Sequence, residues 1–217
     1  MILFTCRISK TDSMPELIQQ SYDATSVAAV VLAAGPSTRM GQPKQLLEFR
    51  GEILLKRAAL SALEAGCRPV VVVTGAYADI SRKALRGIDV IEARNEQWKL
   101  GIGSSVRAGV EAVIEAAPGV DAVVLMLCDQ PFATREVIAR LIKSRHETGR
   151  AIIASSYAES YGAPALFSRE HFVELSALSA DVGAKHIIQK HLARVHIVPF
   201  PEGKIDIDTP EDFAQLS

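Results

Sequence analysis

Short apolar runs alternate along the chain with segments whose apolar residues recur at helical spacing. Runs of strand length cover Val27–Leu32, Pro69–Val73 and Ala122–Leu127. Between them, Ile53–Ala65 and Ser104–Ala117 carry apolar residues on one helical face. This order predicts repeated strand–helix units and therefore an α/β fold.

Weaker segments extend the same pattern. Further strands are predicted at Ile88–Ile91, Ala151–Ala154, Ala163–Phe167, Val195–Val198 and Ile205–Ile207. Further helices are predicted at Ala78–Leu85, from Thr134 to about Glu147, at Arg169–Ala177, at Val182–His191, and from Pro210 onward. Continuous apolar strands are typical of buried parallel sheets. We therefore predict three layers, with a mostly parallel central sheet and helices on both faces. After residue 155 the pattern is less regular and favours an added lobe or an antiparallel edge.

Polarity divides the chain into two parts. Residues 1–26 are polar without a clear period, and we expect a partly disordered N-terminal extension there. The domain is predicted to span 27–217, a length that suits one ample core.

The charge balance narrows the classes of partner. Lys and Arg number 24 against 25 Asp and Glu, whereas a dedicated nucleic-acid binder usually carries a basic excess. No apolar run reaches the ~18 residues of a membrane span. The three cysteines, Cys6, Cys67 and Cys128, lie far apart, as reduced thiols of a cytoplasmic protein would. We expect a cytoplasmic protein with neither a nucleic-acid nor a membrane partner.

The most informative segment is the glycine-containing loop after the first predicted strand. Gly35 and Gly41 permit tight turns whose backbone N–H groups can form an anion nest. Arg39 and Lys44 add two positive charges suited to phosphate oxygens. The spacing matches neither GxxxxGK[ST] nor GxGxxG. It indicates a triphosphate loop of another type, and the alternative is a glycine turn with solvated basic residues.

A carboxylate follows the strongest predicted strand. Asp129 comes two residues after Leu127, and ligands of open α/β sheets bind outside the carboxyl ends of strands. Mg²⁺ prefers one or two carboxylates together with substrate phosphates. Asp129 is therefore a candidate metal ligand, with a helix-capping role as the alternative.

These motifs together resemble a known family. Leu32-Ala-Ala-Gly-x-Ser-x-Arg-Met-Gly-x-Pro-Lys44 is similar to the signature of molybdenum cofactor guanylyl- and cytidylyltransferases. The resemblance covers about residues 27–216. It continues in order through Thr74-Gly75, Asn95 with Trp98 and Gly101, Ser104-Ser105, Cys128-Asp129-Gln130-Pro131, Gly162-x-Pro164-x-Leu166-Phe167 and Asp208-Thr-Pro-Glu-Asp212. The Leu-Ala-Ala-Gly form is closest to the cytidylyltransferase branch.

The resemblance implies a fold and a reaction. The fold would be the Rossmann-like type of nucleotide-diphospho-sugar transferases. The reaction would transfer CMP from CTP, or the corresponding group from another NTP, to the terminal phosphate of a molybdopterin-type acceptor, with release of pyrophosphate. Arg39 and Lys44 would be catalytic, and Mg²⁺ would be held by Asp129 and Asp208. Asp206 stays open as the alternative second ligand, and a role for Asp208 or Thr209 as the cap of the helix that begins at Pro210 stays open as well.

The resemblance also implies binding residues. The expected nucleotide-binding residues are Leu32, Ala33, Ala34, Gly35, Ser37, Thr74, Gly75, Asn95 and Ser104. The expected second-substrate residues are Gln130, Pro131 and Pro164. Simpler roles remain for some of them: Thr74 and Gly75 as a plain turn, and Ser104 as a helix cap. Trp98 is interpreted as a packing anchor.

Other functions stay open from the sequence. One is a sibling transferase that uses GTP or a different phosphate acceptor. Another is a non-catalytic chaperone that delivers molybdenum cofactor to an apo-molybdoenzyme. Hydride transfer has the least support, because the glycine fingerprint is absent. His186 and His191 are expected on a helix surface without a chemical role.

Overall fold

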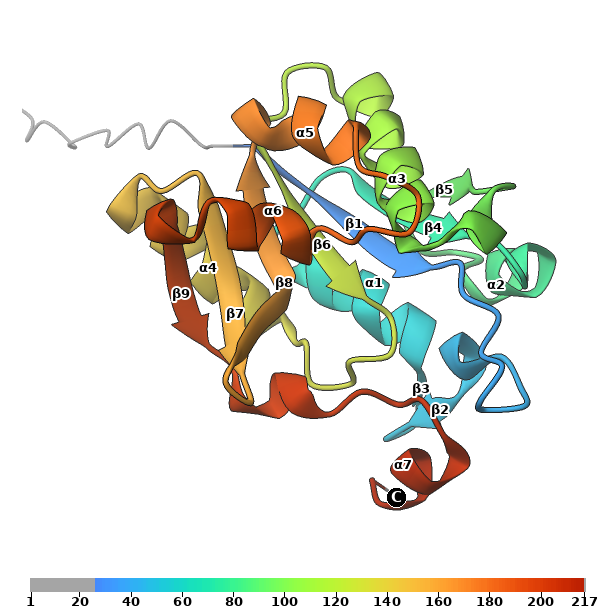
Figure 1. Ribbon diagram of the computed structural model, residues 1–217. Helices are drawn as coiled ribbons and strands as arrows, with labels where there is room; N and C mark the ends of the chain where they lie inside the picture. The colour runs from blue at the N-terminus through green and yellow to red at the C-terminus, as the bar shows by residue number, and fades with distance from the viewer. Residues whose placement is uncertain (1–25, 217) are drawn as a thin grey trace, which may run out of the picture.

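The computed structural model describes residues 26–216 of the protein (Figure 1). The predicted N-terminal extension, 1–26, lies outside the described residues except for Ser26. The remainder, 27–216, lies within the predicted domain, 27–217.

A mixed sheet forms the centre of the described chain. Its strands are β1 (Val27–Ala33), β4 (Val70–Thr74), β5 (Ile91–Arg94), β6 (Ala122–Leu127), β7 (Ile152–Tyr157), β8 (Ser160–Ser168) and β9 (Val195–Pro199). Their order is β5-β4-β1-β6-β8-β7-β9. Among these seven strands only β8 runs against the others. The mostly parallel sheet predicted from the apolar runs is thus confirmed.

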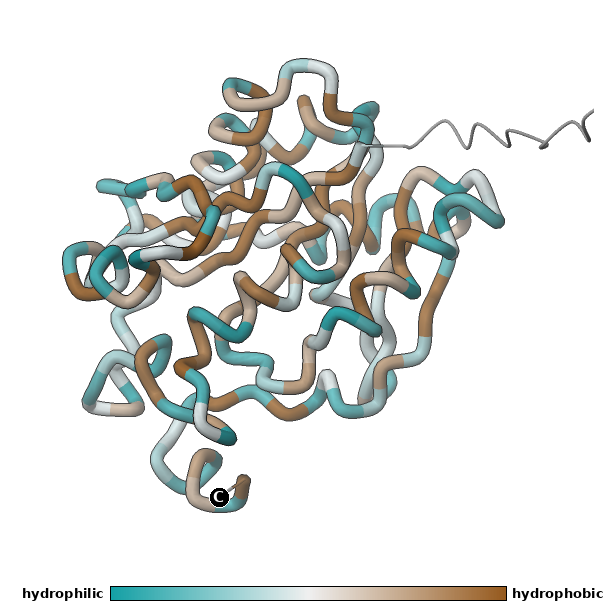
Figure 2. The backbone as a smooth tube through the Cα atoms, turned by 180° about the vertical axis from the view of Figure 1, so that it is seen from behind, coloured by the Kyte–Doolittle hydropathy of each residue, from teal (hydrophilic) through white to brown (hydrophobic). Residues whose placement is uncertain are grey.

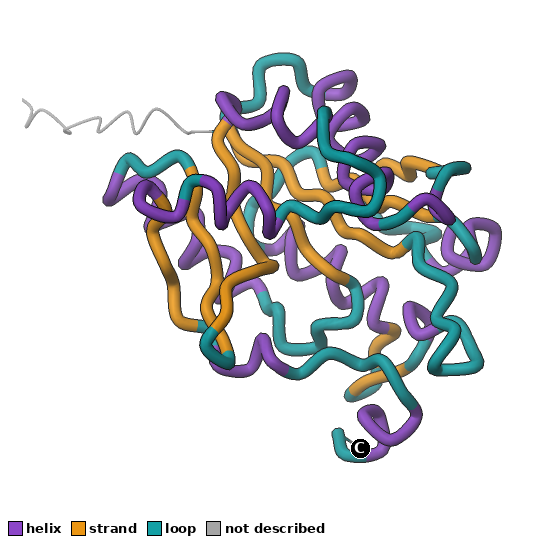
Figure 3. Tube along the Cα trace, viewed as in Figure 1, coloured by secondary structure: helices purple, strands orange, loops and turns teal. Residues whose placement is uncertain are grey.

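Helices cover both faces of the sheet, as predicted (Figure 3). They are α1 (Leu54–Glu64), α2 (Ala78–Ala84), α3 (Ile102–Ala116), α4 (Arg135–Thr148), α5 (Phe172–Ser176), α6 (Lys185–Lys190) and α7 (Pro210–Ala214). Alternate β1 residues divide between two cores: Val31 packs with α1 and α4, and Val30 packs with α3, α5 and α6. The strands at the centre are correspondingly apolar in Figure 2.

Three details of the predicted pattern are wrong. The antiparallel strand β8 lies inside the sheet between β6 and β7, not at an edge. Strand β5 begins at Ile91 because the chain after α2 turns through Ile88, whose N–H donates to the carbonyl of Leu85. Ile205–Ile207 forms no strand. The N–H of Ile207 donates to the carbonyl of Asp129, in the loop after β6, at 3.1 Å.

A small hairpin and the C-terminal tail form a separate apolar cluster beside the sheet. The hairpin, β2 (Glu48–Phe49) and β3 (Glu52–Ile53), was not predicted. Ile207, fully buried, packs with Met40 and Phe49 in this cluster. Helix α7 lies next to the hairpin (Figure 1), and Thr209 and Asp212 form its capping box. This packing brings the tail to the loop after β1.

No helix among residues 26–216 is long and apolar enough to cross a membrane.

Candidate active site

The loop after β1 is closed by side-chain hydrogen bonds. Ser37 has a φ of 49° and Gly41 a φ of 71°, so the chain turns sharply at both positions. The hydroxyl of Ser37 accepts from the N–H of Lys44 at 3.1 Å and donates to Oε1 of buried Gln45 at 3.2 Å. Ser37, predicted to bind nucleotide, therefore ties the two ends of the loop together and fixes where Lys44 begins.

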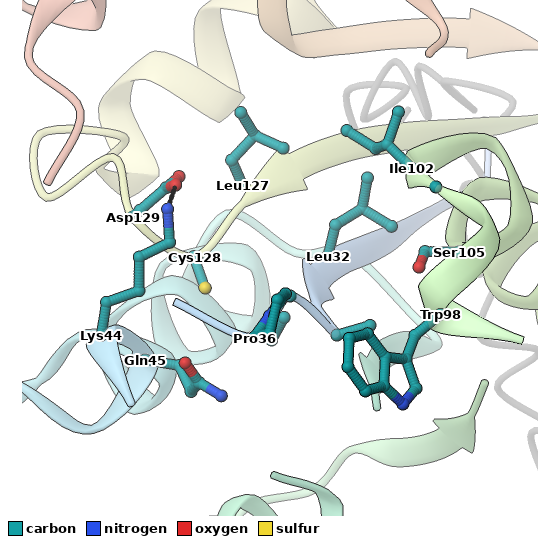
Figure 4. Close-up of a pocket in the computed structure, with 14 residues that line it drawn as sticks. Leu32, Pro36, Lys44, Gln45, Trp98, Ile102, Ser105, Leu127, Cys128 and Asp129 are labelled. Carbon is teal, nitrogen blue, oxygen red and sulfur yellow. Dashed lines mark hydrogen bonds and ion pairs between the residues drawn. The ribbon is translucent and has the colours of Figure 1, made fainter. Parts of the chain in front are cut away.

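Lys44 lies between two carboxylates from distant parts of the chain. Its Nζ contacts Asp129, which follows β6, and lies 2.8 Å from Oδ1 of Asp208 in the C-terminal tail (Figure 4 draws the contact with Asp129). Arg39 donates to the other Asp208 oxygen at 2.7 Å. The structure thus brings together all four residues predicted as catalytic or metal-binding.

Charge pairing dominates the electrostatics of this cluster. Burial alone would lower the pKa of Lys44, but the charge and hydrogen bonds of Asp129 and Asp208 raise it above the ordinary value. Burial would raise the pKa of Asp208, yet Lys44 and Arg39 hold that pKa below its ordinary value. At neutral pH, Lys44 is therefore cationic and Asp208 anionic.

Asp206 is a third carboxylate near the same cluster. Loss of solvent contact raises its pKa to about 6, and the negative charge of Asp129 adds to the shift. The contribution of Asp129 indicates that Asp206 lies within range of the same negative charge. The choice between Asp206 and Asp208 as second metal ligand, left open by the sequence, stays open on this ground.

The donor set fits a hard divalent cation. Oδ1 of Asp129 is buried and has no hydrogen-bond partner among the described residues. A buried carboxylate oxygen without a partner costs free energy unless it meets a cation or a donor. Carboxylate oxygens are the protein ligands that Mg²⁺ accepts beside phosphate and water.

A pocket of about 270 Å³ opens next to Lys44 and Asp129 (Figure 4). Four predicted nucleotide-binding residues line it: Leu32, Ala33, Ala34 and Gly35.

The pocket also has walls that the sequence analysis missed. Ile102, Ser105 and Leu127 line it, and so does Trp98, which was interpreted only as a packing anchor. Trp98 does pack against the core, so it serves both as a packing anchor and as part of the pocket wall. The sequence signal for this wall was the run Gly101-Ile102-Gly103, because helix α3 begins at these glycines.

The other predicted nucleotide residues form the frame behind this pocket. Asn95 is buried and donates to the hydroxyls of Ser104 at 2.8 Å and Ser105 at 3.0 Å. Thr74 is fully buried and donates to Glu92 at 2.8 Å. Neither Thr74, Asn95 nor Ser104 is among the lining residues.

Gly75 is required for close packing. A Cβ at this position would lie 2.6 Å from the carbonyl oxygen of Ala34 and 2.9 Å from Cβ of Trp98. Both neighbours line the pocket. Gly75 therefore lets the turn after β4 support the pocket wall.

A second, largely apolar pocket of about 190 Å³ adjoins the first. Leu32, Ile102 and Leu127 line both pockets. Tyr157, Tyr161 and the backbone around Gly162 form its far side.

None of the three predicted second-substrate residues is among the residues that line this second pocket. Gln130 is buried and donates to the carbonyl of Gly203 at 3.2 Å. The carbonyl of Pro131 accepts from Arg57 at 2.7 Å, and that of Pro164 accepts from Ser155 at 2.6 Å. The two neighbours of Pro164, Ala163 and Ala165, do line the pocket.

The described cysteines supply no nucleophile. Cys67 and Cys128 are free and buried, and burial raises the pKa of both thiols, that of Cys67 to about 12. Cys128 lines the first pocket as a neutral thiol. Cys6 lies outside the described residues.

Comparisons with known proteins identify the family of the chain. Residues 29–195 match the family model described as MobA-like NTP transferase domain. The chain is 32% identical over 208 residues to the nicotine blue oxidoreductase of Paenarthrobacter nicotinovorans, covering 89% of this chain and 98% of that protein. It is 28% identical to the molybdenum cofactor guanylyltransferase of Rhodobacter capsulatus, covering 87% and 94%.

Solved structures show the same fold. Rv0371c from Mycobacterium tuberculosis superposes with a TM-score of 0.73 at 32% identity, covering 89% of this chain and 97% of that chain. Rv0371c is also solved in complex with manganese, with a TM-score of 0.69 at 30% identity and coverage of 88% and 98%.

Proposed function

Because the chain belongs to the family of the MobA-like NTP transferase domain, we propose that it transfers CMP from CTP to a molybdopterin-type acceptor. The acceptor contributes its terminal phosphate, and pyrophosphate leaves. The name of the Rhodobacter capsulatus relative supports the acceptor class. The Leu32-Ala33-Ala34-Gly35 form of the loop supports CTP over GTP.

The observation that carries this proposal is the position of Lys44. It joins the loop after β1 to one carboxylate that follows β6 and one in the C-terminal tail, beside the pocket lined by Leu32, Ala33, Ala34 and Gly35. A cation held by two carboxylates beside a turn of backbone N–H groups suits a triphosphate with its metal. A purely structural role would explain the two ion pairs of Lys44 but not its place in the lining of the pocket.

The residues can promote the transfer through charge and position. An oxygen of the acceptor phosphate attacks the α-phosphorus, the new O–P bond forms, and the bond from the α-phosphorus to the bridging oxygen breaks. Lys44 and Arg39 stabilise the negative charge that moves onto pyrophosphate. The attacking phosphate is already ionised at neutral pH, so the reaction needs no protein base.

Asp129, with Asp208 or Asp206, would hold Mg²⁺. When bound, the ion neutralises charge on the phosphate oxygens and orients them. The manganese complex of Rv0371c supports a divalent ion in this fold.

The second pocket is the proposed place of the acceptor. Leu32, Ile102 and Leu127 line both this pocket and the first pocket. An acceptor in the second pocket would therefore lie next to a nucleotide in the first. Tyr157 and Tyr161 give the apolar and aromatic surface that a flat pterin ring would contact.

Parallel turnover assays test the proposal. The protein is mixed with Mg²⁺, molybdenum-loaded molybdopterin, and one of CTP, GTP, ATP or UTP, and pyrophosphate release is measured. CTP is expected to give the highest kcat/KM. Preference for GTP would replace the nucleotide assignment and leave the reaction class unchanged.

Two results would contradict the reaction class itself. One is binding of the cofactor and transfer to an apo-molybdoenzyme without pyrophosphate release, as a chaperone would show. The other is nucleotide-dependent redox turnover without pyrophosphate release, which the name of the Paenarthrobacter nicotinovorans relative makes worth measuring.

A further inference from the structure

Two histidines and a glutamate converge far from the candidate active site. Oε2 of Glu174 lies 3.3 Å from Nδ1 of His171 and 2.9 Å from Nε2 of His191. One ligand atom from each of the three residues falls within 4.8 Å of the others. His191, expected on a helix surface without chemistry, thus belongs to a partly buried cluster.

The spacing suits a tetrahedral metal ion. Bonds of ~2.0–2.1 Å to imidazole nitrogen and carboxylate oxygen place tetrahedral ligand atoms about 3.3 Å apart. Glu174 already lies at 3.3 Å and 2.9 Å from the two ring nitrogens. The ligand nitrogens of the two imidazoles lie within 4.8 Å of each other, so small shifts would bring all three ligand atoms to this spacing.

Groups around the cluster hold its ligands in place. Lys190 donates to Oε1 of Glu174 at 2.6 Å, which leaves Oε2 for the two histidines. The other ring nitrogen of His171 faces a carboxylate oxygen of Glu170 at 3.6 Å. A carboxylate behind a metal-binding histidine is a common supporting arrangement, because it orients the ring and raises its basicity.

The cluster has access to solvent and room for a further ligand. His171 and His191 line a polar pocket of about 150 Å³, together with Glu170, Arg150 and Arg194. Three protein ligands and an open position are the usual arrangement of zinc with exchangeable water.

This place is separate from the candidate active site. His171 follows β8, whose last residue, Ser168, pairs with Ala122 at the start of β6. Asp129 follows the other end of β6. The five steps of about 3.3 Å along this strand separate the two places by about 16 Å or more.

We propose that His171, Glu174 and His191 form a binding site for Zn²⁺ or a similar transition-metal ion. The ion links the segment after β8 to the end of α6 and leaves one coordination position open toward the polar pocket. Two imidazoles favour this class of metal over Mg²⁺, which prefers oxygen ligands alone.

Calorimetric titration with ZnCl₂ tests the site on the full chain, after chelator treatment and without nucleotide. His171 is buried and its loss can disturb folding, so the ligand variants are His191→Gln and Glu174→Gln. We expect each to weaken zinc binding more than about 100-fold, since loss of a supporting residue alone costs about 10- to 100-fold. Glu170→Gln is expected to fall in that smaller range.

Two control variants and a spectroscopic readout fix the location. His186→Gln changes an exposed histidine on the same helix, and Asp129→Asn alters the active-site carboxylates; both should retain the zinc affinity of the wild type. Zinc should shift the imidazole NMR signals of His171 and His191, and Mg²⁺ should not.

Three results would overturn the site. They are wild-type zinc affinity in His191→Gln and Glu174→Gln, loss of zinc in Asp129→Asn alone, or no micromolar binding by the wild type. Magnesium-dependent pyrophosphate release is measured separately, so its failure leaves this inference untouched.

Discussion

Removal of the Lys44 ammonium group is the perturbation that the active-site geometry defines most sharply. Its Nζ contacts Asp129 and lies 2.8 Å from Oδ1 of Asp208, and its side chain is only 17% exposed. Lys44→Ala therefore deletes a shielded positive charge beside the pocket while leaving the loop backbone, which Ser37 holds through the N–H, in place.

Two independent magnitudes give the expected effect. Unit charges 4 Å apart at an effective dielectric constant of 20 interact by about 4 kcal/mol. Loss of one preorganised donor in comparable sites costs about 2.7–4 kcal/mol, or about 10²–10³ in rate. We therefore expect kcat for pyrophosphate release to fall by about 10²–10³ in Lys44→Ala.

The assay compares pyrophosphate release at saturating CTP and acceptor, with thermal unfolding followed by circular dichroism. Lys143→Ala is the matched control, because Lys143 is 72% exposed and pairs only across one turn of α4 with Glu147. Turnover within a few-fold of wild type in folded Lys44→Ala would refute the catalytic role of this lysine.

Further predictions concern the metal, the pocket wall and the distal cluster. Asp129→Asn should lower turnover by about 10²–10³ and raise the Mg²⁺ concentration needed for half-maximal rate, measured by magnesium titration. Gly75→Ala should destabilise the fold by about 1–3 kcal/mol and raise the KM for CTP, because its Cβ would meet Ala34 at 2.6 Å; Gly119→Ala, with open space around its Cβ, should do neither. Burial would raise the pKa of Glu174, but hydrogen bonds from Lys190, His191 and His171 lower it to about 2. These bonds to the ionised carboxylate therefore stabilise the fold above about pH 4.5, and their contribution disappears as the pH falls toward 2. Urea unfolding with chelator present gives the free energy of unfolding of the wild type and of Glu174→Gln at each pH. The difference between the two should shrink from pH 4.5 to pH 2; a difference that stays constant would contradict this role of Glu174.

The sequence predicted the central sheet well because its signal is local. Continuous apolar runs such as Ala122–Leu127 match the observed strand at both ends, since a strand buried on both faces needs apolar residues throughout. The loop with Arg39 and Lys44 could likewise be singled out from the sequence, because its glycine and basic residues lie close together in the chain.

Features that depend on distant contacts were less accessible. Ile207 resembles a strand residue but is buried against Met40 and Phe49 by the returning tail, and no local period encodes that packing. The position of β8 within the sheet depends on pairing with β6 and β7. The histidine cluster joins residues up to 20 positions apart, so residue spacing alone gave no indication of it.

Isotope transfer shows directly which phosphorus of the nucleotide the protein moves to the acceptor. The protein is incubated with Mg²⁺, molybdenum-loaded molybdopterin and CTP labelled either at the α- or at the γ-phosphorus. We expect the α-label to move to the acceptor and the γ-label to appear in pyrophosphate, and we expect Lys44→Ala to lose nearly all of both products. An acceptor that carries the γ-label, or no labelled product from any nucleoside triphosphate, would contradict the proposed reaction.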